Sequence, residues 1–239
     1  MERLEREKEF HDKRFSKKEQ KSNLYEFGLN NWYKKYIELI LKSNESTLEI
    51  GAGMESCFIE YPVLRKNLSR SNAKITSIDI SYVSVKKCNE LNLKNIKFIV
   101  EDAHELNNIE DFSFSKIVGR GIIHHLNISK FTNTLKSKAG KNCKYIFAEP
   151  MVGPFYIRLY RFFTPNLRTV DEQPLRIKDI KLIENSFLGK KNRIYYGFLT
   201  IPFALIGIKS KLIETLDYFI LNKLRLGRIL AWAVIISNV

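Results

Sequence analysis

The sequence is short of cysteine and of long apolar runs. Its three cysteines are odd in number and scattered, and no CxxC pair or Cys/His cluster occurs, so we expect neither a disulfide framework nor a metal site. The uncharged run Ile194–Ile208 has only 15 residues, whereas a membrane-spanning helix needs about 20. The first 21 residues are too highly charged for a signal peptide. These absences predict a cytoplasmic protein in a reducing setting, without a transmembrane helix.

The composition is that of a globular protein with a basic surplus. With 239 residues, 44% hydrophobic and 12% aromatic, the chain can form one α/β domain with a real core. The net charge is +14, and residues 151–239 hold 14 Lys/Arg against 6 Asp/Glu. Such a surplus can serve an anionic partner such as RNA or lipid headgroups. A bias toward Lys, Asn and Ile in the genome would explain the surplus equally well.

From residue 47 onward, short strand-like runs alternate with segments of helical length. Strands are expected at residues 47–50, 75–80, 96–100, 116–118 and 144–148. Helices are expected between them at residues 54–68, 83–91 and 128–137. This alternation predicts βαβ units and a mostly parallel sheet. The carboxyl ends of its strands would share one edge, where ligands bind in such folds.

The two ends of the chain depart from this alternation. Residues 1–45 form a separate N-terminal segment, with an exposed helix expected over 1–22 and a second helix over 31–42. The main domain would then comprise residues 46–239, with cap segments at about 151–170 and 204–224. After residue 150 we expect a helix at 176–185, a strand at 193–201, a helix at 204–224 and a β-rich run at 229–239.

A glycine-rich turn follows the first expected strand, in the order Leu48-Glu49-Ile50-Gly51-Ala52-Gly53. Glycines allow a tight strand-to-helix turn and a close approach of a ligand to the backbone. A dinucleotide-binding fingerprint needs a third glycine where Ser56 stands, which disfavours a nicotinamide cofactor. An acidic residue two places before the first glycine suits a cofactor with a cationic amino-acid end and no pyrophosphate.

Polar residues also follow the next three expected strands. Asp79 ends the second strand, where it could accept hydrogen bonds from two ribose hydroxyls or simply cap the following helix. Asp102 and Ala103 end the third, where a carboxylate and a backbone N–H could hold an adenine. Gly119-Arg120 ends the fourth, and His124-His125-Leu126 follows it. Features at four successive strand ends predict a cofactor site more strongly than any one of them.

Taken in order, these motifs resemble those of class I S-adenosylmethionine (SAM) dependent methyltransferases, over residues 47–150. They are most similar to the small-molecule, ubiquinone-methylase-like branch (methyltransferase type 11). The resemblance implies a Rossmann-like seven-stranded, mostly parallel sheet with helices on both faces and the last strand antiparallel, and SAM as cofactor. One departure is Glu55, where many members have glycine or a small polar residue. The implied cofactor-binding residues are Glu49, Gly51, Ala52 and Gly53 at the methionine end, Asp79 and Ile80 at the ribose, Asp102 and Ala103 at the adenine, and Gly119 and Arg120 beside the methionine portion.

Methyl transfer from a sulfonium needs mainly in-line positioning of donor and acceptor. An oxygen acceptor usually also needs a base, and the candidates are His124, His125 and Glu149. Each has a structural alternative: the histidines could pack or cap the next helix, and Glu149 could pair with a nearby arginine.

The acceptor would be chosen by the two cap segments. Residues 155–168 combine aromatic rings with arginines, which suits a lipid tail with an anionic headgroup or an ordinary packed cap. We therefore predict methyl transfer to a small-molecule, lipid or glycan-type acceptor, with peripheral contact to the inner face of an anionic membrane. The alternatives are an RNA methyltransferase and a non-catalytic SAM-fold protein that contacts membranes. No Asn/Asp-Pro-Pro-Tyr motif and no RRM or KH signature occurs, so nucleic acid is not the expected partner.

Overall fold

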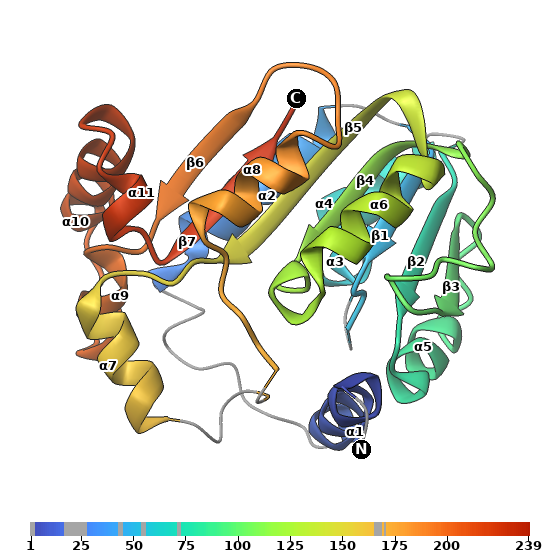
Figure 1. The fold of residues 1–239 in the computed structure, drawn as a ribbon, viewed down its shortest axis with the longest axis horizontal. Coiled ribbons are helices and arrows are strands. Elements are labelled where there is room, and N and C mark those ends of the chain that lie inside the picture. The colour runs from blue at the N-terminus through green and yellow to red at the C-terminus, as the bar shows by residue number, and fades with distance from the viewer. Residues whose placement is uncertain are drawn as a thin grey trace.

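A seven-stranded sheet forms the centre of the computed structural model (Figure 1), which describes residues 3–16, 28–42, 45–53, 56–70, 73–164, 169 and 171–239. The strand order is β3-β2-β1-β4-β5-β7-β6, and β7 pairs antiparallel with both β5 and β6, while β1 to β5 are parallel. The strands are β1 (Thr47–Ile50), β2 (Ile75–Asp79), β3 (Ile96–Val100), β4 (Phe114–Arg120), β5 (Ala139–Pro150), β6 (Asn192–Tyr196) and β7 (Ala233–Ser237). The predicted seven-stranded fold with an antiparallel last strand is confirmed.

Helices cover both faces of this sheet, as Figure 1 shows. One face packs on the front helices, α6 (Ile128–Lys138) and α8 (Ile177–Glu184). The other packs on α2 (Asn30–Leu41), α3 (Cys57–Glu60) and α4 (Pro62–Arg70). Double coverage explains why β1 and β7 are buried at every position instead of alternating. Helix α5 (Tyr82–Asn89) packs beside β2 and β3.

The last third of the chain differs from the sequence prediction in detail. The strand predicted over 193–201 ends at Tyr196, because Gly197 has a φ of +92° and α9 (Thr200–Leu205) begins three residues later. The predicted helix over 204–224 is instead α10 (Lys211–Tyr218) followed by a π-helical turn (Phe219–Lys223). The final β-rich run starts with one turn of helix, α11 (Gly227–Leu230), before β7. The segment at 54–68 also holds two helices, α3 and α4, with a break just before Pro62.

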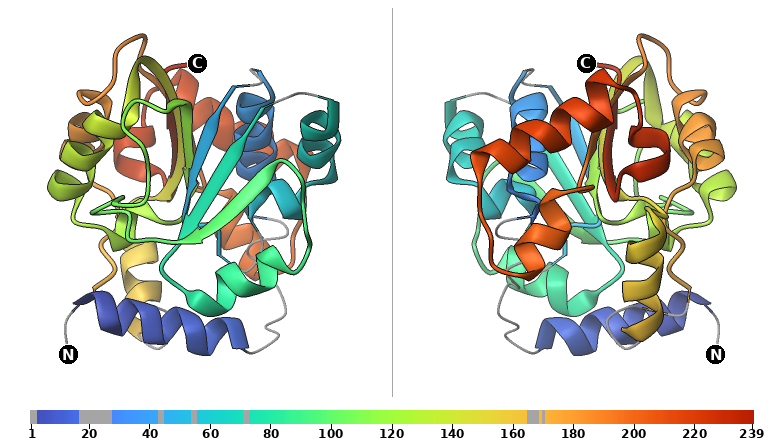
Figure 2. Two further views of the ribbon diagram at one scale, coloured as in Figure 1. Left: turned by 90° about the vertical axis from the view of Figure 1, so that its right-hand side faces the viewer. Right: turned by 90° about the vertical axis from the view of Figure 1, so that its left-hand side faces the viewer.

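The N-terminal helix α1 (Arg3–Ser16) lies across the carboxyl edge of the sheet (Figure 2). Arg3 donates to the carbonyl of His125 over 2.7 Å, and Arg6 forms a two-pronged ion pair with Asp171. Farther along the helix, Asp12 accepts a hydrogen bond from Ser81, just beyond β2. The prediction of an exposed helix here is therefore wrong for one face of α1. Long-range contacts made by its polar side chains hold that face down.

The remaining elements gather at one end of the molecule. Helix α7 (Phe155–Phe163) follows β5 and lies near α9, α10 and α11 (Figures 1 and 2). None of the helices in the described ranges is both long and apolar enough to cross a membrane. The departure noted at Glu55 and the predicted basic residue Arg168 lie outside the described residues. The proposed domain boundary at residue 45 stays a prediction, although α2 belongs to the core on one face of the sheet.

Candidate active site

The glycine turn after β1 requires its glycines. Gly51 and Gly53 have φ values of +71° and +59°, a region that side chains disfavour. The N–H groups of Gly51 and Ala52 both donate to the carbonyl of Ile78, over 2.9 and 3.0 Å. A Cβ on Gly51 would lie only 2.7 Å from the Cβ of Ile122. This turn therefore needs glycine both for its backbone conformation and for its close packing against Ile122.

Glu49, two residues before the turn, contacts the segments that flank it. Its carboxylate accepts the hydroxyls of Ser56 and Ser77, each over 2.5 Å, and the N–H of Cys57 over 2.8 Å. The last contact satisfies a backbone donor at the start of α3. Glu49 is buried, and these contacts fix the connection between β1 and α3. Its predicted role at the methionine end of a cofactor stays a prediction.

Asp79 joins the ends of β1 and β2. One carboxylate oxygen accepts the N–H of Gly53 and the other the N–H of Ser81, both over 2.8 Å. Burial raises the pKa of Asp79, while these two N–H groups oppose the shift. Each oxygen has a second lone pair, so the side chain can still accept hydroxyl donors from a ligand. Ile80, which follows it, is half-buried.

The loop after β3 is shaped by a second group of carboxylates. Asp102 accepts the backbone N–H of His104 over 2.9 Å and contacts its ring Nδ1 over 2.8 Å. Burial acts to raise the pKa of Asp102, but the His104 contacts outweigh it and lower that pKa. Glu101 is buried and accepts from the backbone and side chain of Asn108. Ala103 follows Asp102 in the sequence and is buried. It lies at the same carboxyl edge of the sheet as Asp79.

Gly119 and Arg120 end β4 in different surroundings. Gly119 is packed inside: a Cβ there would lie 3.1 Å from Ile122 and 3.2 Å from Phe147. Arg120 donates to Glu60 over 2.6 Å, and its guanidinium lies 5.0 Å from the centre of the Tyr33 ring. Burial disfavours the charge of Arg120, yet the neighbouring Glu60 holds its pKa above the ordinary value. The predicted contacts of both residues with a methionine portion stay predictions.

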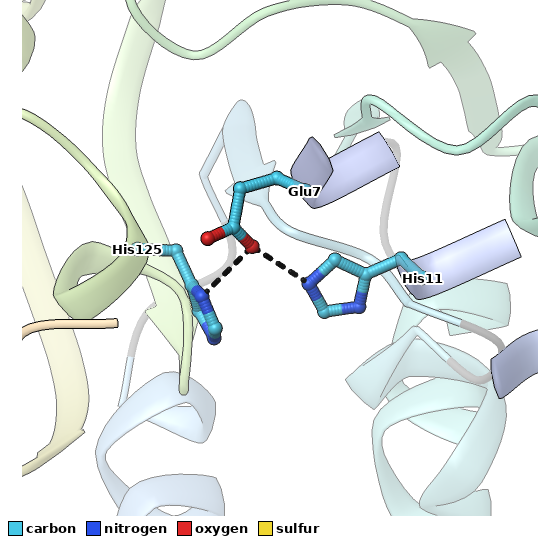
Figure 3. A group of neighbouring side chains, drawn as sticks. All are labelled: Glu7, His11 and His125. Atoms are coloured by element: carbon cyan, nitrogen blue, oxygen red, sulfur yellow. Dashed lines mark ion pairs between the residues drawn. The ribbon is translucent and has the colours of Figure 1, made fainter. Parts of the chain in front are cut away.

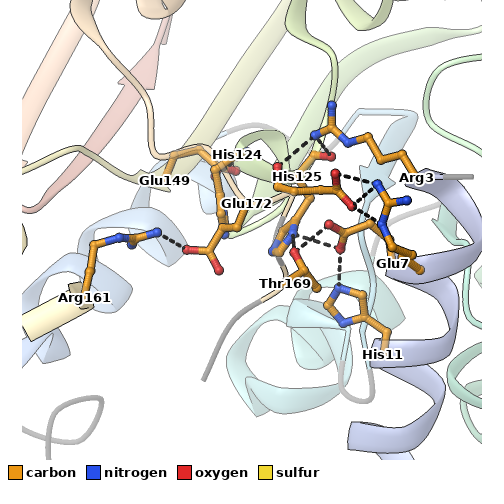
Figure 4. A network of polar contacts seen from close by, with 11 residues as sticks. Arg3, Glu7, His11, His124, His125, Glu149, Arg161, Thr169 and Glu172 are labelled. Atoms are coloured by element: carbon orange, nitrogen blue, oxygen red, sulfur yellow. Dashed lines mark hydrogen bonds and ion pairs between the residues drawn. The ribbon is translucent and has the colours of Figure 1, made fainter. Parts of the chain in front are cut away.

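The three base candidates are divided between two clusters (Figure 4). Glu149 is fully buried, and one oxygen accepts the N–H groups of Ile122 and Ile123, each over 3.0 Å. Its other oxygen lies 2.8 Å from His124 Nδ1. Because Glu149 already serves as an acceptor for backbone N–H groups, Nδ1 is the donor of this pair, which leaves the imidazole lone pair on Nε2. Glu149 thus pairs with His124 and not with an arginine.

His125 turns toward the N-terminal helix instead. The centre of its ring lies 4.1 Å from that of His124, with the two planes tilted by 43°, and its Nδ1 lies 3.1 Å from a carboxylate oxygen of Glu7. Burial lowers the pKa of His125, with Glu7 opposing the shift. Burial also acts to raise the pKa of Glu7, but the adjacent His11, His125 and Thr169 side chains bring it well below its usual range.

Sequence reasoning missed Glu7, His11 and Thr169. The hydroxyl of Thr169 donates to Glu7 over 2.6 Å across 162 residues of sequence. No local pattern reveals such a contact, because a mixed-charge helix has the same composition whether its face is docked or solvated. One feature of the sequence that could have singled out His11 is the rarity of histidine, since the chain has only four.

Comparison with known proteins identifies the family and the fold. Residues 41–179 match a family profile described as a methyltransferase domain. No curated protein sequence is similar enough to match. Among solved structures, a SAM-dependent methyltransferase from Archaeoglobus fulgidus aligns with a TM-score of 0.57 and 14% identity, over 87% of this chain and 92% of that one.

Two further structures come from enzymes whose acceptors are named. Geranyl diphosphate C-methyltransferase from Streptomyces coelicolor A3(2), with Mg²⁺, geranyl diphosphate and S-adenosyl-L-homocysteine, has a TM-score of 0.60 at 8% identity, over 87% of this chain and 79% of that one. Phosphoethanolamine N-methyltransferase 2 from Haemonchus contortus, with S-adenosyl-L-methionine, has a TM-score of 0.57 at 14% identity, over 87% of this chain and 52% of that one. At these identities the likeness shows the fold alone. The profile match covers more than half of the chain, which therefore belongs to the methyltransferase domain family and has the fold of class I SAM-dependent methyltransferases.

Proposed function

We propose that this chain transfers a methyl group from SAM to a small-molecule acceptor, a class in which we include lipids and glycan-type molecules. The observation that carries the proposal is the meeting of the Gly51–Gly53 turn, Asp79, Asp102 and the His124–Glu149 pair at one sheet edge. In folds of this kind the carboxyl edge is where ligands bind.

The residues at this edge fit the proposed cofactor. The backbone of the turn at Gly51 packs against Ile122 too closely for a Cβ, and its positive φ values set the backbone that a ligand at this edge would contact. Asp79 retains acceptor capacity for two ribose hydroxyls, and the Asp102–Ala103 backbone lies at the next strand end. The bound cofactor would supply an activated methyl group on a sulfonium, so the protein mainly has to orient the acceptor.

His124 is the residue we assign as general base for an oxygen acceptor. Glu149 fixes its ring from the Nδ1 side and so leaves Nε2 as the proton acceptor. A buried carboxylate that orients an imidazole in this way is a recurrent catalytic arrangement. Glu149 is then a positioning residue, and His125 faces the other cluster, that of α1.

The acceptor is best identified by labelling. Extracts of water-soluble metabolites, lipids and RNA would be incubated separately with the protein and methyl-labelled SAM. We expect label in the metabolite or lipid fraction, in line with the small acceptors named for the similar structures. Label in RNA alone would overturn the proposal in favour of an RNA methyltransferase. Absence of SAM binding by calorimetry would favour a non-catalytic protein.

Asp79→Ala is expected to weaken SAM binding about tenfold or more. The reason is the loss of a charged acceptor for the ribose hydroxyls, since one hydrogen bond to a charged group is worth about 1.5–3 kcal/mol. Calorimetry on the folded variant measures the change, and Asp79→Asn, which keeps one acceptor for the backbone, should lie between the two. Asp111→Ala, at an exposed aspartate paired with Lys138, is the control and should bind SAM normally. Equal affinities for all four proteins would refute the ribose assignment.

We also propose that the end of the molecule formed by α7, α9 and α10 contacts an anionic membrane. Phe162 and Phe163 on α7 are 76% and 70% exposed, although the cap interpretation would have buried them. Arg158 lies exposed on the same helix, whereas Arg161 is paired with Glu172 over 2.6 Å. Further exposed leucines and isoleucines lie on α9, on α10 and in the loop between them: Leu205, Ile206, Ile208, Leu212 and Leu216.

Basic charge accompanies this surface. Residues 200–230 hold five Lys/Arg, all exposed, against Glu214 and the buried Asp217. Near an anionic surface each cation contributes about 1 kcal/mol, and an apolar ring adds burial at roughly 25 cal/mol per Å². Rings and cations on one end of a molecule suit insertion at the headgroup level.

Association with vesicles tests this contact. We expect co-sedimentation with phosphatidylserine-containing vesicles that weakens with salt and falls several-fold in the Phe162→Ser/Phe163→Ser double variant. Phe112→Ser is the matched control, because Phe112 is 67% exposed but lies just before β4, at the amino ends of the parallel strands. Equal sedimentation of the protein with neutral and anionic vesicles, or none with either, would contradict the proposal.

A further inference from the structure

We propose that Glu7, His11 and His125 bind a divalent transition-metal ion between α1 and the segment after β4. The inference goes beyond methyl transfer and does not depend on it. Glu7 and His11 are one helical turn apart on α1, and His125 belongs to the 3₁₀ turn Ile123–His125. In Figure 3 one oxygen of Glu7 lies between the two imidazole rings.

The three ligand atoms are as close together as they would be around one ion. Glu7 Oε2 lies 3.1 Å from His125 Nδ1 and 3.5 Å from His11 Nε2, and all three atoms fall within 4.8 Å of one another. Ligands bound at about 2.0–2.2 Å to a tetrahedral ion are separated by similar spans.

The hydrogen bonds of Glu7 give a second, independent reason. Its Oε1 accepts the Thr169 hydroxyl over 2.6 Å. Its Oε2 is fully buried, in a residue only 4% exposed, and has no partner of hydrogen-bonding geometry within the described part of the chain. A buried carboxylate oxygen without a hydrogen bond is costly. The two imidazole nitrogens that lie next to this oxygen are at ion-pair distance from it, so the same three atoms could instead hold one cation between them.

The donor set indicates the class of ion. Two imidazole nitrogens and one carboxylate oxygen suit Zn²⁺, Fe²⁺ or Co²⁺, whereas Mg²⁺ and Ca²⁺ prefer oxygen ligands alone. A second set, His124, His125 and Glu172, shares one member with the first. We favour the first set because Glu172 is already paired with Arg161, and His124 with Glu149.

Such an ion would do two things. With three protein ligands, it would retain an open coordination position, at which a small molecule could bind. It would also join α1 to the segment after β4, and so fasten the helix that covers the carboxyl edge. Arg3, Arg6 and Asp12 already hold this helix at other points.

Titration of the full chain, prepared without a histidine tag, with Co²⁺ tests the site. We expect a visible d–d absorption at one equivalent, displaced by Zn²⁺, and a rise in melting temperature of about 5–10 °C at a hundredfold excess over Kd. His11→Ala should lower Co²⁺ affinity by more than the ~10–100-fold that loss of an outer-shell partner costs.

Two controls keep the result decisive. His104→Ala removes the one histidine outside both metal-binding sets and should leave Co²⁺ binding unchanged. His11→Gln replaces the ring with a polar side chain of similar reach and weaker affinity for transition metals, and serves if the alanine variant fails to fold. No absorption in the wild type, or equal Co²⁺ affinity in the His11 variant and the wild type, overturns the proposal. SAM affinity measured without metal reports separately on the proposed methyltransferase.

Discussion

Gly51→Val is expected to abolish SAM binding and to lower the free energy of unfolding by about 2–6 kcal/mol. The first cost is backbone strain, because Gly51 has a φ of +71°, where a β-branched residue pays about 1–3 kcal/mol. The second is overpacking against Ile122, which a Cβ would approach to 2.7 Å, at about 1–3 kcal/mol. To relieve this contact the turn would have to shift, and with it the backbone that is expected to contact the cofactor. Thermal unfolding and SAM calorimetry measure the two effects.

Gly207→Val separates strain from collision. Gly207 also has a positive φ, of +78°, but nothing lies within 4 Å of the position of its Cβ. The free energy of unfolding of this control should therefore fall only by the cost of backbone strain. It should bind SAM as the wild type does. A folded Gly51→Val protein with normal SAM affinity would show that the turn does not hold the cofactor. Gly51→Ala, with less bulk, should retain the fold and lose most of the affinity.

The parallel sheet and its edge could be predicted because their signals are local. Strand-end residues such as Asp79 and Asp102 stand beside their strands in sequence, and parallel strands bring such ends together whatever the loops do. The Gly51–Gly53 turn is likewise local, since the φ that it needs restricts the residue type.

The rest of the site depends on contacts that no window of sequence contains. Glu7 meets His125 and Thr169 only because α1 crosses the sheet edge. The sequence predicts one strand over residues 193–201, but the positive φ of Gly197 ends it and α9 begins at Thr200. The aromatic residues of α7 fit a buried cap or an exposed surface equally well by composition. Their exposure is decided by which helices pack beside them.

The second large effect is a fall in kcat on changing the His124–Glu149 pair. Rescue by added imidazole distinguishes the two residues. His124→Ala should lower kcat by about 10²–10⁴-fold, the usual contribution of a general base. Added imidazole should restore part of the rate, because the alanine leaves space for it. Both rates would be measured on the acceptor found by labelling. SAM affinity should change little, since neither side chain is among the residues assigned to the cofactor.

Glu149→Gln should lower kcat by up to about 10⁴-fold with almost no change of shape. Its amide oxygen can still accept from Ile122 and Ile123, but its NH₂ group then faces His124 Nδ1. The imidazole must accept there, which moves its proton to Nε2 and removes the lone pair needed for catalysis; the equivalent change in a serine protease triad costs about 10⁴. Added imidazole should not rescue this variant, because the His124 ring still occupies the site. Glu184→Gln is the control: Glu184 is also buried and pairs with Arg193, so this variant should lose stability but keep kcat. Unchanged kcat in both the His124 and Glu149 variants would show that the pair only supports the turn after β4.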